Sequence, residues 1–84
     1  MMTKQRPPKK VANKVREWCD ERGLDKMDFV EKCIRAGVNI EGKRLTYDTI
    51  SRVYDGDTNI SMMTATLISL AAGVTSISEL FDIE

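Results

Sequence analysis

The segment TYDTISRVYDG, residues 46–56, carries the clearest helical pattern in the chain. Its apolar side chains recur at i, i+3 and i+4 and make one narrow stripe: Ile50, Val53 and Tyr54. Thr46 is a suitable N-cap, because its hydroxyl can accept a hydrogen bond from a backbone N–H of the first turn. Gly56 ends the pattern. We therefore predict a helix from Tyr47 to about Asp55, followed by a polar loop.

Two amphipathic segments precede this helix. The first ends at Gly23, and its stripe at i, i+4, i+7 and i+8 consists of Val11, Val15, Trp18 and Cys19. The second begins after the N-cap Asp25 and closes at Ala36-Gly37, and its apolar face consists of Phe29, Val30, Cys33 and Ile34. Both stripes follow the helical period, so we predict two helices here, with Trp18 and both cysteines in the core.

Two further helices are predicted after the loop. Ser61 caps the fourth helix, Gly73 ends it, and its inward face is Met63, Leu67, Leu70 and Ala71, with Ile68 beside them. Ser76 and Glu79 form a capping box that opens a short fifth helix. The inward residues of this fifth helix are Ile77, Leu80 and Phe81.

Residues 38–45, VNIEGKRL, interrupt the series of helices. They show no helical period, and Glu41-Gly42 is a turn signal. Either the second helix continues by one or two turns, or these residues form a projecting loop or a small hairpin. Apart from that hairpin, no segment alternates as a strand does, and the sequence predicts an all-α fold of five helices.

The length and charge distribution indicate one domain with a basic arm. A chain of 84 residues has room for one core, and 42% hydrophobic with 31% charged residues is typical of a globular protein. Thirteen basic and thirteen acidic residues cancel, but the first 16 residues hold six bases and no acid. We expect a flexible basic arm over residues 1–10, which could wrap around DNA or serve only as a solubilising tail, and a domain over 11–84.

Several functional classes are excluded at this stage. No run of about 18 apolar residues is present, so we expect no membrane span, and the basic N-terminus lacks the apolar stretch of a secretory signal. The chain has no histidine and only two cysteines, which excludes His-dependent triads and leaves too few ligands for a structural zinc site. We expect reduced, buried thiols, no metal, no cofactor and no enzymatic activity.

The order of these motifs resembles the XRE (lambda repressor/Cro-like) helix-turn-helix family. The most specific pieces are TISRV (49–53) with a glycine at 56, and AAGV…ISELF (71–81). The resemblance extends from about Val11 to Phe81 and implies a five-helix, lambda-repressor-like DNA-binding domain. The chain departs from the family between helices two and three, where the connection is about ten residues longer than the family's tight turn.

The resemblance makes the helix beginning at Tyr47 the one that enters the major groove. The matching base-contact positions are Tyr47, Asp48, Ser51 and Arg52. Helical spacing independently places these four residues opposite the apolar stripe. Arg52 can offer a forked pair of donors to guanine O6 and N7, and Asp48 can accept from cytosine N4. The alternative is a solvated polar face that contacts nothing.

Other residues are candidates for contacts to the DNA backbone, which position a protein without reading sequence. They are Lys26, Lys43, Arg44, Thr46, Thr58 and Asn59. Thr46 stands at a helix N-terminus, where free N–H groups favour a phosphate. Asp55 and Asp57 would repel phosphate unless their turn points away.

The sequence thus predicts a sequence-specific transcriptional regulator, with repression as the expected mode. The resemblance implies double-stranded DNA as partner, a homodimer, and a bacterial or phage origin in the cytoplasm with the nucleoid. Met62 and the group Ile77, Phe81 and Ile83 are candidates for a partner surface. The alternative is a protein-interaction module, such as an antitoxin-like partner, with weak DNA binding.

Overall fold

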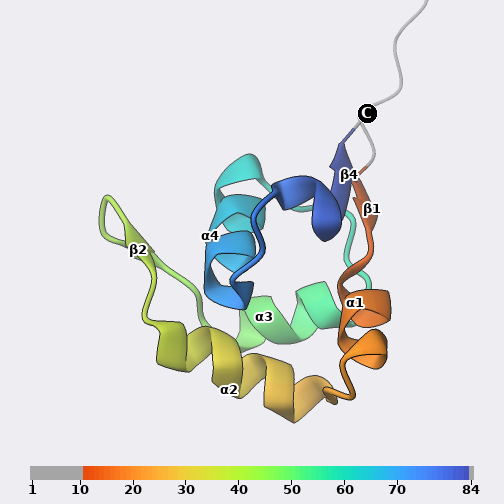
Figure 1. Cartoon of the computed structure of the whole chain (residues 1–84). Coiled ribbons are helices and arrows are strands. Elements are labelled where there is room, and N and C mark those ends of the chain that lie inside the picture. Colours follow the sequence, from red (N-terminus) through yellow and green to blue (C-terminus); the bar gives the residue numbers. More distant parts are fainter. Residues whose placement is uncertain (1–10, 84) are drawn as a thin grey trace, which may run out of the picture.

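The structure, a computed structural model, describes residues 11–83, which form four helices, a 3-10 turn and four short strands (Figure 1). In chain order these are β1 (Val11–Asn13), α1 (Val15–Glu21), α2 (Lys26–Ala36), β2 (Asn39–Ile40), β3 (Lys43–Arg44), α3 (Tyr47–Tyr54), α4 (Met62–Ala72), η1 (Ile77–Glu79) and β4 (Phe81–Ile83). The prediction of an all-α, five-helix fold is therefore wrong, and the fold is mixed α/β. The predicted arm, residues 1–10, lies outside the described residues.

The first correction concerns the start of the chain. The predicted first helix begins at Val15 and not at Val11, because Val11–Asn13 is a strand that pairs antiparallel with β4 (Figure 1). Asn13 is the last residue of β1, two positions before α1 begins. Its Oδ1 accepts from the Val15 N–H at 2.9 Å, and its Nδ2 donates to the carbonyls of Val53 and Asp57 at 2.7 and 2.9 Å. The partner strand β4 lies some 70 residues away along the chain, so the helical spacing around Val11 could not reveal the pairing.

The second correction concerns the end of the chain. The predicted capping box is confirmed, because the Glu79 carboxylate accepts from the Ser76 N–H at 3.4 Å and the Ser76 hydroxyl caps the turn in return. The helix it opens is only the 3-10 turn η1, and the chain continues as β4. Leu80 and Phe81 are buried as predicted, although they lie at and after the end of the turn and not on a helix.

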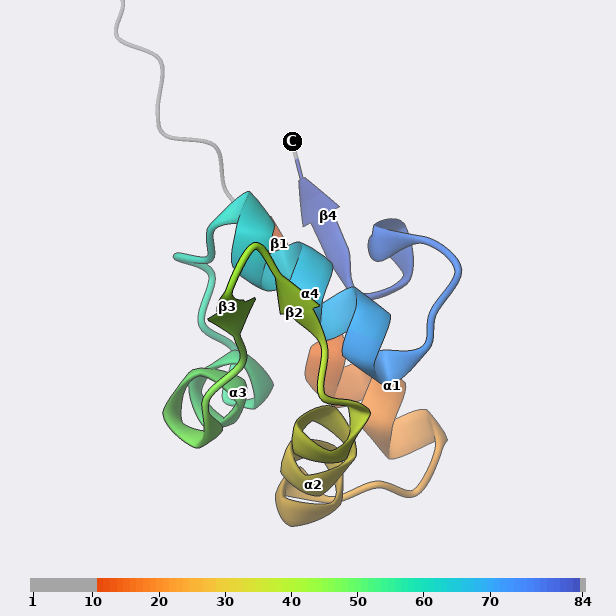
Figure 2. The ribbon, with the colours of Figure 1, turned by 90° about the vertical axis from the view of Figure 1, so that its left-hand side faces the viewer.

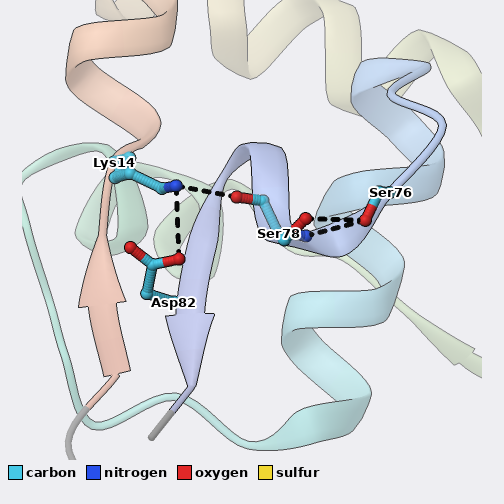
Figure 3. Close-up of polar contacts among 4 residues, drawn as sticks. All are labelled: Lys14, Ser76, Ser78 and Asp82. Atoms are coloured by element: carbon cyan, nitrogen blue, oxygen red, sulfur yellow. Dashed lines mark hydrogen bonds and ion pairs between the residues drawn. The ribbon is translucent and has the colours of Figure 1, made fainter.

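Lys14 fastens these two terminal elements together. Its backbone N–H donates to the Leu80 carbonyl at 2.7 Å, and its Nζ donates to the Ser78 carbonyl at 2.7 Å. The same ammonium lies 3.4 Å from the Asp82 carboxylate (Figure 3). A single lysine therefore links the end of β1 to both η1 and β4.

The core lies between the four helices and the β1–β4 sheet. Its largest fully buried side chains are Phe29, Phe81, Ile50, Ile68 and Leu80. Trp18 is buried, as predicted, with its ring edge-on to Phe29 at a centroid distance of 6.1 Å. Both cysteines are buried and free, which also agrees with the prediction.

Two residues assigned to apolar faces are instead exposed. Ile34 of α2 is exposed, and Leu70 of α4 is 54% exposed, while Met63 is only partly buried. On α4 the buried set is Ala65, Leu67, Ile68, Ser69, Ala71 and Ala72. This set surrounds Ile68 on one side of the helix. Leu70 falls on the other side, because α4 is apolar on nearly every side and its pattern alone could not choose the buried one.

The connection between α2 and α3 is the small hairpin among the alternatives left open by the sequence. Helix α2 ends at the left-handed Gly37, as predicted, and β2 pairs with β3. Glu41 and Gly42 both have positive φ, 50° and 83°, which is the requirement of a type I′ hairpin turn. The hairpin projects from the body between the ends of α2 and α3 (Figures 1 and 2).

Helices within residues 11–83 are all too short to cross a bilayer. In the same part of the chain, no three side chains of the His, Cys, Asp or Glu types are grouped as a metal ion would need.

Candidate nucleic-acid interface

Helix α3 has one buried side and one exposed side. Ile50, Val53 and Tyr54 are buried against the rest of the core. On the opposite side Tyr47 is 54% exposed, Asp48 and Arg52 are exposed, and Ser51 is half-buried at the margin. The structure therefore brings the four predicted base-contact residues to one side of α3, with Ser51 the least accessible. We call this surface, Tyr47, Asp48, Ser51 and Arg52, the outer face of α3.

The beginning of α3 is as the sequence predicts. Thr46 has an extended backbone, and its Oγ1 accepts from the Thr49 N–H at 3.2 Å and donates to the Thr49 hydroxyl at 2.9 Å. The hydroxyl of Thr46 is thus occupied within the helix cap. What the N-terminus of α3 offers a phosphate is its remaining backbone N–H groups, which lack partners in any helix.

An ion pair spans the outer face of α3. Arg52 Nε lies 3.3 Å from Asp48 Oδ2, one helical turn away, and both side chains are well exposed. Such an exposed pair contributes roughly 0.3–0.5 kcal/mol, so a ligand can separate the two groups at little cost. Asp48 therefore keeps the Arg52 side chain along the helix surface in the free protein, and Arg52 stays available to a ligand.

Tyr47 is anchored at the other end of this face. Its hydroxyl donates to the Met27 sulfur at 3.2 Å, which joins α3 to the first turn of α2. The ring stays exposed. Tyr47 can therefore pack or hydrogen-bond outward while Met27 supports it from behind.

Among the basic candidates for backbone contacts, Lys26 differs from Lys43 and Arg44 because it has an ion-pair partner. Its Nζ lies 2.9 Å from the Asp55 carboxylate, which ties the first turn of α2 to the C-cap of α3. A lysine in the first turn of a helix faces the positive end of the helix dipole, so a nearby carboxylate is favourable there. The charge of Asp55, expected to repel phosphate, is thus balanced by Lys26.

The basic charge without such a partner lies on the hairpin. Lys43 and Arg44 form β3, are exposed, and take part in no ion pair among residues 11–83. Only Leu45 separates them from Thr46, and β3 leads into the N-terminal end of α3 (Figure 2).

Thr58 and Asn59 lie in the exposed loop after α3. The Asn59 N–H donates to the Asp57 carboxylate at 2.9 Å. Asn59 helps to line a polar cleft that Arg52 also lines. The structure therefore brings Asn59 together with Arg52, at the opposite end of α3 from the hairpin.

Sequence reasoning missed three contributors to this cleft. Thr49, Ser61 and Thr64 line it together with Arg52, and Ser61 Oγ accepts from the Thr64 N–H at 3.1 Å as the cap of α4. Ser61 was recognised as a cap but not as a neighbour of Arg52. No local pattern signalled this, because Thr49 and Ser61 belong to different helical segments and only the fold brings both to the cleft.

Asn13 was also missed, although it supports the interface from behind. By donating to the carbonyls of Val53 and Asp57, it holds the last turn of α3 and the loop that follows. Those carbonyls are 40 and 44 residues away along the chain, so no local pattern could have identified Asn13.

No protein-family model, no curated protein and no solved structure matches this chain.

Proposed function

We propose that this protein binds a specific site on double-stranded DNA through α3 and regulates transcription, with repression by occupancy of that site as its mode. The observation that carries the proposal is the outer face of α3, where four polar side chains stand clear of the core. A helix of this kind fits the major groove, where side chains reach the base edges. The resemblance of TISRV (49–53) and AAGV…ISELF (71–81) to the XRE family supports the same function.

Base reading is assigned to the outer face of α3. The guanidinium of Arg52 leaves Asp48 and donates two hydrogen bonds to guanine, while Asp48 accepts from a neighbouring cytosine. The exchange is inexpensive, because the free protein loses only one exposed ion pair. Tyr47 and Ser51 contact the adjacent bases, Ser51 only where the groove reaches the margin of the face.

Contacts to the phosphate backbone are assigned to both ends of α3. Lys43, Arg44 and the N-terminus capped by Thr46 serve one strand, and Thr58 with Asn59 serves the other end of the helix. Lys26 contributes only as it leaves Asp55, so its effect on affinity is smaller than that of Lys43 or Arg44. A two-fold DNA site requires two copies of the chain, so the proposed regulator is a homodimer acting in the cytoplasm.

The experiment is selection of bound sequences from a randomised duplex pool at about 0.15 M salt. The wild type is compared with Arg52→Lys, which keeps the charge but loses the fork, and with Arg52→Ala. Arg35→Ala is the matched control, because Arg35 is an exposed arginine in the last turn of α2, at the far end of that helix from Lys26.

The wild type and Arg35→Ala are expected to enrich the same motif. Arg52→Lys should keep most of the affinity for random DNA but lose the preference for guanine at one position, at a cost of about 1–3 kcal/mol. No enrichment by the wild type, with binding that disappears as salt rises, would refute the proposal. The alternative of a protein-interaction module would then take its place.

A further inference from the structure

A recess lies where the ends of α1 and α4 meet α2 and η1. Its volume is about 340 Å³, within the range of roughly 300–1,000 Å³ that small-molecule sites occupy. Among the described residues that line it, none belongs to α3, so the recess is separate from the candidate nucleic-acid interface. We call it the α1–α4 recess.

One part of the recess is apolar. Trp18 is buried, and Leu24 and Val74 are partly buried against the core. Ala72, the last residue of α4, lines the recess together with these three. This part can take the apolar group of a ligand out of water.

The other part is charged, and Arg22 is held there by its own helix. Its guanidinium lies 4.1 Å from the centre of the Trp18 ring, and its Nη1 donates to the Trp18 carbonyl at 3.1 Å. Its ion pair with the neighbouring Glu21, at 3.6 Å, uses the same nitrogen. Within residues 11–83 its other N–H donors have no partner, so they are available to an anion.

Glu79 brings the opposite charge to the recess. Three donors converge on its Oε2: the Thr75 N–H at 3.2 Å, the Thr75 hydroxyl at 2.9 Å and the Ser76 N–H at 3.4 Å. The bond from the Thr75 hydroxyl, the two backbone bonds and the charge of Arg22 hold the pKa of Glu79 below its ordinary value. The carboxylate is therefore ionised at neutral pH. Its Oε1 accepts no hydrogen bond from the part of the chain that the structure describes.

Arg22 and Glu79 line the same recess, yet they form no ion pair among residues 11–83. Each side chain is bonded to the backbone of its own segment, which keeps the two charges apart. Lys32 of α2 also lines the recess, is exposed, and takes part in no ion pair in the same range. A ligand that carries both charges can bridge these groups, whereas a ligand with one charge would meet a like charge in so small a space.

We propose that the α1–α4 recess binds a free α-amino acid with an apolar side chain. The carboxylate of the ligand accepts from Arg22 and Lys32, two cations for its two oxygens. Its ammonium donates to Glu79 Oε1. The recess also receives the C-terminal end of α4, where the negative end of the helix dipole favours a cation. The side chain of the ligand packs on the apolar part of the recess.

The test is equilibrium dialysis of the full chain, without DNA, against radiolabelled L-leucine and L-phenylalanine at neutral pH. Trp18 is the single tryptophan of the chain and lines the recess, so its fluorescence provides a second readout. The amide of each amino acid lacks the carboxylate, and the N-acetyl derivative lacks the ammonium. Both are measured beside the parent compound.

Two variants remove one charge each from the recess, Lys32→Gln and Glu79→Gln. The second keeps a carbonyl oxygen that can accept from Thr75 and Ser76. Arg35→Gln and Glu31→Gln are the matched controls, because both residues are exposed on α2 and do not line the recess. Circular dichroism verifies that each variant is folded.

The wild type and both controls should bind an apolar amino acid saturably, one per chain, with a change in Trp18 fluorescence. The amide and the N-acetyl derivative should bind at least ~10-fold more weakly, since each loses a charged hydrogen bond. Lys32→Gln and Glu79→Gln should each weaken binding about 3- to 5-fold, because both side chains are exposed. Lys32→Gln should also narrow the difference between amino acid and amide, and Glu79→Gln that between amino acid and N-acetyl derivative.

Three results would overturn the proposal. Absence of saturable binding of both amino acids would remove the site. An N-acetyl derivative that binds as tightly as its parent would show that the recess selects an anion and not a zwitterion. Controls that weaken binding as much as Lys32→Gln and Glu79→Gln would show a long-range effect of charge and no contact. The measurement uses the free protein, so its outcome is independent of sequence selection with DNA.

Discussion

Cys19 and Cys33 serve this protein as small buried side chains. Burial raises the pKa of the Cys33 thiol from 9.0 to about 12 and that of Cys19 to about 11, because a thiolate would lose its hydration in the core. The nearby Asp20 carboxylate raises the pKa of Cys19 further, and Arg22 opposes it. Both thiols are therefore protonated in the folded protein at neutral pH and are poor nucleophiles.

The raised pKa of Cys33 predicts a loss of stability in alkali. Above pH 9 the unfolded chain releases the Cys33 proton while the folded chain keeps it, so the free energy of unfolding falls as pH rises. Between pH 8 and 10 this single group should account for about 1 kcal/mol. Urea unfolding of the wild type and of Cys33→Ala at several pH values measures it.

The comparison isolates one thiol, because every other ionisable group is present in both proteins. The variant is expected to start from a lower stability but to lose less on going to pH 10. Equal losses in the two proteins would show that the Cys33 thiol is already hydrated in the folded state.

Among the elements, β1 and β4 were the hardest to predict. Each has three residues, too few to show an alternation, and each exists because the other supplies its hydrogen bonds. The helices were easier, because their caps are local. Asp25 accepts from the Asp28 N–H at 2.8 Å, as its position before the helical stripe indicated, and Thr46 and Ser61 cap α3 and α4 as predicted.

Lys14 joins β1 to η1 and β4 through two polar contacts, and we predict that these two contacts contribute unequally to the free energy of unfolding. Lys14→Met keeps the apolar stem but removes both the hydrogen bond to the Ser78 carbonyl and the ion pair with Asp82 (Figure 3), and should cost about 1 kcal/mol. Asp82→Asn removes only an exposed ion pair, and should cost less than about 0.5 kcal/mol. Urea denaturation of the two variants and the wild type provides the measurement. Equal losses would mean that the ion pair holds β4.

The molecule as a whole depends on a core that its C-terminal segment completes. Leu80 is fully buried and Phe81 nearly so, and both pack with residues from the helices. A chain of this size has a stability of only about 5–15 kcal/mol, so the loss of one such side chain is a large fraction of it.

Two leucines of the chain make a matched test of this arrangement. Leu80→Ala should cost about 2–5 kcal/mol, because it leaves a cavity in the core. Leu70→Ala, at a position that the sequence also assigned to the core, should change the stability of the monomer by less than about 0.5 kcal/mol. Thermal unfolding at low protein concentration, where self-association is weak, distinguishes the two. Similar losses would contradict the exposed position of Leu70.

Some features of the candidate interface follow from spacing along one helix, and others arise from contacts between elements that are distant in the chain. The outer face of α3 follows from the spacing of Tyr47, Asp48, Ser51 and Arg52 along one helix, so the sequence predicted which residues share it. The ion pair between Lys26 and Asp55 and the cleft that joins Arg52 to Asn59 and Ser61 arise between elements. No spacing along the chain encodes those neighbours.

By itself, the sequence determined the features that depend on residues within one or two helical turns of one another. The helical caps, the left-handed glycine ends, the turn at Glu41-Gly42 and the burial of Trp18 all depend on interactions within a few residues, or on strong hydrophobicity at a helical period. Only the tertiary structure decided that Val11–Asn13 and Phe81–Ile83 are strands and that Leu70 faces outward. A three-residue strand is stable only with a partner, and a helix that is apolar on nearly every side buries whichever side its neighbours cover.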